Sequence, residues 1–343
     1  MYSFEQLMIP VWSSEIVYDE CVTMIKRNGI AEAPLLFDPE KILSVTSADK
    51  MAEYEEGRDW ELHENMFRLT EQSRIFAFDE NEVIFDEKRR GSSFATVDGK
   101  YSLFHEGHFF HDRQISITYK KLNKQPAFVP EFCGDLLPVT MGKLQNRECV
   151  TMVLFGDSIA AGANSSGMTL TTPFLPSWGA LFAENLKRHY DTEVRFFNSS
   201  KGGTSSYWGI EHADRLVGEY TPDLAIIAFG MNDGDEPPVF VENIRRIQNL
   251  ITMTSPNTEF ILCATTVPNQ RLEGFWRHQA EYAQALMKET RTGVAVADFG
   301  GMQKYLLGRK RFIDLTGNNV NHPNDFMIRC HAQLLSDMMI KNN

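Results

Sequence analysis

The chain has 343 residues and a formal net charge of −12, and 43% of its residues are hydrophobic. The chain is longer than the domains that fold around a single hydrophobic core, so two domains are expected. The hydrophobic fraction is that of a globular protein. The negative charge disfavours nucleic acid and anionic membranes as partners, and no apolar run reaches the ~18 residues of a membrane span. The opening residues lack the basic and apolar parts of a signal peptide, so we expect a cytoplasmic protein. The five cysteines are widely spaced and odd in number, which argues against a disulfide framework and against a zinc site.

Residues 1–140 contain short strand-like runs separated by turn residues, without long helical patterns between them. The runs lie at 41–48, 59–69, 82–88, 93–104 and 113–121. Such a pattern predicts an antiparallel β-sandwich, and we assign residues 1–140 to this domain. Residues 15–29 fit either a helix that ends at Gly29 or a strand. The junction is expected near 126–148, where proline and glycine interrupt the pattern.

Residues 148–343 alternate apolar runs with amphipathic helical patterns. The strand-like runs lie at 150–156, 193–200, 223–230, 259–266 and 293–300. Helical patterns cover 177–190, 241–253, 273–289 and the segment that starts at 324. Strands alternating with helices predict β-α-β units and a parallel sheet covered on both faces. We therefore expect a three-layer α/β/α domain with a five-stranded, flavodoxin-like sheet.

Polar and small residues follow these strands at the edge where open parallel sheets bind ligands. Ser158 follows the first strand, Gly203 the second and Asn232 the third, while His322 precedes the last helix. Ser158 could be only a helix N-cap. However, a serine nucleophile needs a base such as histidine, which titrates close to neutral pH. The developing oxyanion needs donors, and the backbone N–H groups of Ser158 and Gly203 and the amide of Asn232 are candidates.

With these residues in this order, the chain resembles the SGNH (GDSL-type) hydrolases. The four motif blocks of that family correspond to GDSI (156–159), NSSKGGTS (198–205), GMND (230–233) and NHPND (321–325). The resemblance covers about residues 148–343. It implies Ser158 as the nucleophile, Gly203 and Asn232 as oxyanion donors and His322 as the base.

One position departs from the family pattern. The family usually has aspartate three residues before the histidine, and here that residue is Asn319. We therefore predict a Ser158–His322 dyad whose imidazole is oriented by a side-chain or backbone carbonyl, with Asn319 as one candidate. Asp314 and Asp325 are the carboxylates nearest in sequence, and either could restore a triad.

Several other residues invite a functional interpretation. Asn164, in the polar run GANSSG, and Trp208, after the second block, could contact substrate; helix packing is an equal explanation for Trp208. The run from His105 through His108 to His111 lacks the spacing of a helical zinc motif, so no metal is expected. The sequence around Ser158 is not a phosphate loop, and we expect no cofactor. The lone histidines are expected to be surface or packing residues: His189, His212, His278 and His331.

A β-sandwich ahead of an SGNH domain is similar to carbohydrate esterases that carry an N-terminal jelly roll. That resemblance implies a serine esterase that removes a small acyl group, most of all acetyl, from an oligosaccharide or a smaller sugar. Two alternatives stay open at this point. One is a lysophospholipase or thioesterase that acts on long acyl chains, and the other is an inactive glycan-binding scaffold. The sequence leaves the oligomeric state and the natural substrate open.

Overall fold

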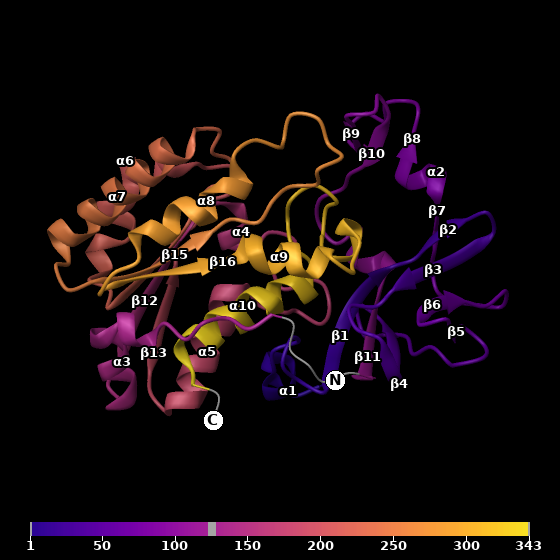
Figure 1. Ribbon diagram of the computed structural model, residues 1–343, viewed down its shortest axis with the longest axis horizontal. Coiled ribbons are helices and arrows are strands. Elements are labelled where there is room, and N and C mark those ends of the chain that lie inside the picture. The colour runs from indigo at the N-terminus through magenta and orange to yellow at the C-terminus, as the bar shows by residue number, and fades with distance from the viewer. Residues whose placement is uncertain (1, 123–127, 342–343) are drawn as a thin grey trace.

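Five parallel strands form the central sheet of the second half of the chain (Figure 1). In this computed structural model, which describes residues 2–122 and 128–341, they pair in the order β13-β12-β14-β15-β16. The strands are β12 (Val150–Gly156), β13 (Val194–Asn198), β14 (Leu224–Ala228), β15 (Glu259–Ala264) and β16 (Val294–Asp298). All four pairings are parallel. This is the flavodoxin-like order expected from the sequence.

Helices cover both faces of this sheet because its strands are apolar on both sides. One face packs against α5 (Trp178–Tyr190), α9 (Phe299–Leu307) and α10 (Asp325–Met339). The other face packs against α6 (Ser206–Leu216), α7 (Pro237–Thr254) and α8 (Gln279–Leu286). In Figure 1 the two helical layers lie on opposite sides of the orange and magenta strands. The predicted three-layer arrangement is confirmed.

The N-terminal region consists of short strands, most of which pair antiparallel. One sheet has the order β1-β11-β4, a second β5-β6-β3-β2-β7, and a small third β8-β10-β9. The helices and strands of the N-terminal region are α1 (Phe4–Met8), β1 (Ile16–Thr23), β2 (Ile25–Arg27), β3 (Ile30–Pro34), β4 (Pro39–Ser47), β5 (Trp60–His63), β6 (Met66–Leu69), β7 (Phe78–Asp79), α2 (Glu80–Val83), β8 (Ile84–Phe85), β9 (Ser93–Ala95), β10 (Tyr101–Leu103) and β11 (Gln114–Lys121). The pair β2–β7 is parallel. The predicted antiparallel sheet region is confirmed, and its jelly-roll connectivity stays a prediction.

The segment 15–29, which fitted both helix and strand, forms β1 and β2. Pairing with β11 explains this outcome, because β1 makes an antiparallel ladder whose inward side chains enter the core. Long-range pairing overrides the local helical spacing here.

The two halves share one hydrophobic core. A single cluster contains Val22 of β1 and Ile117 of β11 together with Phe182 of α5 and Leu335 of α10. The expected junction, 126–148, contains α3 (Pro138–Gln145), while residues 126 and 127 lie outside the described residues. The boundaries 1–140 and 148–343 stay a prediction. Within the described residues, no helix combines the length and the apolarity needed to cross a bilayer.

Candidate active site

The nucleophile candidate lies at a tight strand-to-helix junction. β12 ends at Gly156, where an added Cβ would collide with the carbonyl oxygen of Ala228, so only glycine fits. Asp157 is the N-cap of the short helix α4 (Ser158–Ala161), and its Oδ1 accepts a hydrogen bond of 2.9 Å from the N–H of Ile159. The capping role therefore belongs to Asp157. The hydroxyl of Ser158 is left to interact elsewhere.

That hydroxyl meets the imidazole predicted to be its base. The distance between Ser158 Oγ and His322 Nε2 is 2.9 Å, although the two residues are 164 positions apart in the sequence. His322 lies in the loop before α10, and its side chain is 13% exposed. The pair has the separation that proton transfer from a serine to a histidine requires.

The other imidazole nitrogen has two partners that sequence reasoning did not assign to it. Nδ1 lies 2.7 Å from Oδ1 of Asn164 and 3.3 Å from Oε2 of Glu106. Asn164 was expected to contact substrate, and Glu106 was not singled out. Glu106 follows β10 in the N-terminal region, so residues from both halves of the chain surround His322.

The orientation of the Asn164 amide fixes the imidazole tautomer. Its Nδ2 donates to the carbonyl oxygens of Gly107, at 2.8 Å, and Gly317, at 3.3 Å. Its oxygen consequently faces Nδ1 of His322, which must carry the hydrogen. In the neutral ring Nε2 is then free to accept the hydrogen bond from Ser158. Asn164 has a φ of +61°, a left-handed conformation that asparagine tolerates better than most residues.

Glu106 is held by a second asparagine. Its Oε1 accepts from Nδ2 of Asn318 at 3.1 Å, and Oδ1 of Asn318 accepts from the backbone N–H of His322 at 3.1 Å. Burial alone would raise the pKa of Glu106, but the hydrogen bond and charge of His322 and the amides of Asn318 and Asn164 outweigh that effect and lower the pKa. The carboxylate is therefore ionised at neutral pH.

The loops that carry Gly203 and Asn232, the predicted oxyanion donors, contact the turn that carries Ser158. The N–H of Lys201 donates to the carbonyl of Gly156 at 3.0 Å, which fixes the glycine loop beside Ser158. An added Cβ at Gly202 would lie 3.7 Å from the Cβ of Ser158, and Gly203 has a φ of +75° in open surroundings. The amide of Asn232 donates to the carbonyl of Thr204 at 2.9 Å, and its second N–H has no acceptor among the described residues. The loops after three strands therefore meet at one edge of the sheet.

Two buried carboxylates brace these loops. Asp157 also accepts from the N–H of Met231 at 3.4 Å, and burial raises its pKa to about 7. Asp233 accepts from the N–H of Ser206 at 3.0 Å at the start of α6, and burial raises its pKa as well. Both side chains therefore hold the backbone of the loops that carry the site.

The structure does not bring Asn319 to the imidazole. Its amide donates to Oγ of Ser102 at 3.1 Å and to the carbonyl of Leu103 at 2.9 Å. The two alternative carboxylates are also engaged elsewhere. Asp314 accepts from Arg311 and from the N–H of Thr23, whereas Oδ1 of Asp325 accepts from the N–H of Ser166 at 2.8 Å.

Trp208 and the histidines of the run 105–111 have partners other than the Ser158–His322 pair. The indole of Trp208 stacks on His212 with ring centroids 4.5 Å apart and also packs against Phe155, so helix packing occupies it. In the histidine run, His108 pairs with Asp112 at 2.6 Å and His111 contacts the carbonyl of Thr172 at 2.7 Å. Among the described residues, no group of three or more histidine, cysteine or acidic side chains is placed to hold a metal.

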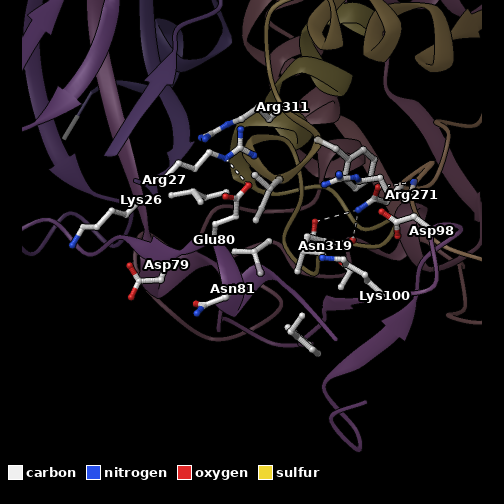
Figure 2. A pocket seen from close by; sticks show the side chains of 18 of the residues that line it. Lys26, Arg27, Asp79, Glu80, Asn81, Asp98, Lys100, Arg271, Arg311 and Asn319 are labelled. Carbon is white, nitrogen blue, oxygen red and sulfur yellow. Dashed lines mark hydrogen bonds and ion pairs between the residues drawn. The ribbon is translucent and has the colours of Figure 1, made fainter. Parts of the chain in front are cut away.

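A large polar cavity lies apart from the nucleophile. Its volume is about 980 Å³, and it is lined by β2, α2, the β9–β10 turn and parts of the second half (Figure 2). Asn319, in the loop that also carries His322, lines this cavity. The side chain of Asn269 donates to the carbonyl oxygen of Asn319 at 3.1 Å. Arg27 and Glu80, which both line the cavity, form an ion pair with 3.0 Å between Nε and Oε1 (Figure 2). This cavity and the Ser158–His322 pair are thus distinct features of the structure.

A serine bonded to a histidine at the carboxyl edge of a 2-1-3-4-5 parallel sheet, beside a glycine loop and an asparagine amide, defines the flavodoxin-like SGNH class of hydrolases. The sequence profile of the GDSL-like lipase/acylhydrolase family matches residues 154–326, just over half of the chain. The chain belongs to this family.

Two relatives show how far the likeness extends. An arylesterase of Vibrio mimicus is 29% identical over 109 residues, which are 31% of this chain and 50% of that protein. The chain thus spans about half the length of that curated relative. A crystallised two-domain esterase active on acetylated mannans is 19% identical, with a TM-score of 0.50 over 62% of this chain and 55% of that one. At this identity the likeness concerns the fold.

Proposed function

We propose that this chain is a serine esterase that removes small acyl groups, acetyl most of all, from a carbohydrate. The observation that carries the proposal is the 2.9 Å contact between Ser158 Oγ and His322 Nε2. Membership of the GDSL-like lipase/acylhydrolase family supports an ester as the substrate.

The chemistry proceeds through a covalent acyl-enzyme. Ser158 Oγ attacks the ester carbonyl while His322 Nε2 accepts its proton. The N–H groups of Ser158 and Gly203 and the amide of Asn232 stabilise the oxyanion. The tetrahedral intermediate collapses, the sugar alkoxide leaves with the proton from His322, and Ser158 holds the acyl group. Water, deprotonated by His322, then releases the acid and restores the serine.

A carbohydrate is favoured by an exposed aromatic ring after the glycine loop and by one relative. The ring of Tyr207, just after the glycine loop, is 48% exposed. An exposed tyrosine suits a hydroxyl-rich ligand with an apolar face. The two-domain relative acts on acetylated mannans, which makes an acetylated saccharide the first substrate class to test.

One observation favours the alternative of a long acyl chain. In the loop that follows α4, Met168, Leu170 and Phe174 are 56%, 83% and 56% exposed. Apolar side chains held in solvent, on a loop that starts beside the reactive serine, could receive an alkyl chain. We retain a lysophospholipase or thioesterase activity as the second candidate.

Labelling with a fluorophosphonate separates an enzyme from an inactive glycan-binding scaffold. We expect wild-type protein to be labelled at Ser158, Ser158→Ala to be unlabelled and His322→Ala to react at least about 10²-fold more slowly. The matched control is Ser13→Ala, which removes an exposed serine of the N-terminal region and should be labelled like wild type. Equal labelling of wild type and Ser158→Ala would overturn the proposal.

Chain-length preference identifies the substrate class. Nitrophenyl esters from acetate to dodecanoate and a panel of acetylated sugars are compared by kcat/KM. The carbohydrate proposal expects a maximum at acetate together with acetate release from an acetylated saccharide. A maximum at eight carbons or more would instead establish the long-chain alternative.

A further inference from the structure

The partners of His322 Nδ1 have two separate roles, which are to hold the tautomer of the ring and to stabilise its positive charge. A partner must first hold the tautomer in which Nδ1 carries the hydrogen, and the Asn164 oxygen at 2.7 Å does this. When Nε2 takes the serine proton, the ring becomes positively charged, and a neutral amide gives that charge little stabilisation. A carboxylate attracts the charged ring much more strongly than it attracts the neutral one.

Glu106 is the carboxylate in contact with this ring. Its Oε2 lies 3.3 Å from Nδ1, while Asn318 anchors its other oxygen at 3.1 Å. Asp314 lies under Arg311, and Asp325 holds the loop at Ser166. Asp157 interacts with His322 through its charge. Its two oxygens, however, accept from the N–H groups of Ile159 and Met231 and not from the ring. Of these carboxylates, the one that contacts the ring among the described residues comes from the N-terminal region.

We infer that Glu106 is a positioning residue that stabilises the protonated His322 during acyl transfer, while Asn164 separately fixes the tautomer. The inference rests on the proposed esterase function. The duties that one aspartate performs in a Ser-His-Asp triad are divided here between an amide of the catalytic half and a carboxylate of the N-terminal region. The N-terminal region is then part of the proton-transfer apparatus as well as a packing partner.

Glu106→Gln is the decisive variant, because it removes the charge and keeps an oxygen for Asn318. In a Ser-His-Asp triad, where the aspartate also fixes the tautomer, replacing the aspartate lowers kcat by about 10⁴-fold. Here Asn164 keeps the tautomer and the Glu106 side chain is 51% exposed, so we expect a smaller loss of kcat, about 10- to 100-fold. KM should change little, because Glu106 acts through the ring. Glu106→Asp, with a carboxylate one methylene short, should recover part of the loss.

The pH profile distinguishes this role from a purely structural one. A carboxylate beside the ring favours its protonated form, so its removal should move the acidic limb of kcat/KM to lower pH while the plateau falls. Asp112→Asn is the matched control, since that carboxylate lies in the same segment and bonds His108. It should leave both the plateau and the limb as in wild type.

The assays use the full-length protein with nitrophenyl acetate, and the rate of fluorophosphonate labelling of Ser158 serves as a substrate-independent measure. Near-wild-type melting temperatures would show that the variants are folded. A lower plateau with the acidic limb displaced to lower pH, partly restored by Glu106→Asp, supports the inference. Wild-type rates in Glu106→Gln, or a lower plateau with an unmoved limb, overturn it. Failure of the esterase proposal is seen separately, as activity that survives in Ser158→Ala.

Discussion

The fully buried imidazole of His331 in α10 makes the stability of the folded protein sensitive to acid. Its side chain is 0% exposed and stacks on Phe299, with ring centroids 4.2 Å apart and planes at 16°. Neither ring nitrogen has a hydrogen-bond partner among the described residues. Burial lowers the pKa of His331 from 6.5 to about 3. We predict that His331→Leu removes about 2 kcal/mol from the stability loss of the protein in mild acid.

The magnitude follows from the two pKa values. Above pH 6.5 the imidazole is neutral in both the folded and the unfolded chain, and the group adds no pH dependence. As the pH falls below 6.5, the unfolded chain binds a proton that the folded chain refuses until about pH 3, so stability is lost. Between about pH 7.5 and about pH 5.0 this amounts to about 2 kcal/mol.

Urea unfolding of wild type and His331→Leu at both pH values measures the effect. The cost of repacking leucine beside Phe299 is the same at either pH. It therefore cancels when the free energy of unfolding of the variant minus that of wild type is compared between the two pH values. This difference should be about 2 kcal/mol more favourable to the variant at the lower pH. The exposed His189→Leu, as a matched control, should keep the wild-type dependence. Parallel loss of stability in wild type and His331→Leu would show that the folded protein accommodates the proton, which would refute the reasoning.

Three further substitutions test the candidate site and the stability of the fold. Asn232→Ala removes one proposed oxyanion donor and should lower kcat by about 10²- to 10³-fold with little change in KM, measured on nitrophenyl acetate; an unchanged kcat would exclude the donor role. Lys310→Met removes the cation that lies 2.6 Å from Oε1 of the buried Glu20, which keeps its hydrogen bonds from Tyr119 and Leu36, and should cost about 3 kcal/mol in urea unfolding. Adding Glu20→Gln should recover part of that loss, and no recovery would place the cost in packing alone. Gly156→Ala sets a Cβ against the Ala228 carbonyl and should cost about 3 kcal/mol or more, read from the melting temperature and soluble yield; a wild-type melting temperature would contradict the close approach.

The parallel sheet could be predicted because each strand carries its own signal. The run 150–156 coincides with β12, and the run 223–230 contains β14, since strands buried on both faces must be apolar throughout. In the N-terminal region the signal is weaker. Whether 15–29 forms helix or strand depends on pairing with β11, which lies far along the chain and leaves no local mark.

The same difference between local signals and long-range packing explains which site residues could be predicted from the sequence. Ser158 and His322 could be paired from sequence because parallel strands deliver their ends to one edge. Glu106 could not, because its position beside the ring depends on how the N-terminal strands pack on the catalytic half. Asn319 has a φ of +63° in a tight turn, and its amide leads toward β10 rather than the imidazole. Residue spacing alone contains no information about that turn.

The contact between the first residues of the chain and its last helix has a consequence for biosynthesis. The indole N–H of Trp12 donates to Asp337 of α10 at 2.8 Å across 325 positions, and Gln333 donates to the carbonyl of Leu7. A ribosome therefore releases the N-terminal strands long before the helix that completes their core. During that interval their apolar face has no native cover, so chaperone occupancy on the nascent chain should persist until α10 has left the exit tunnel.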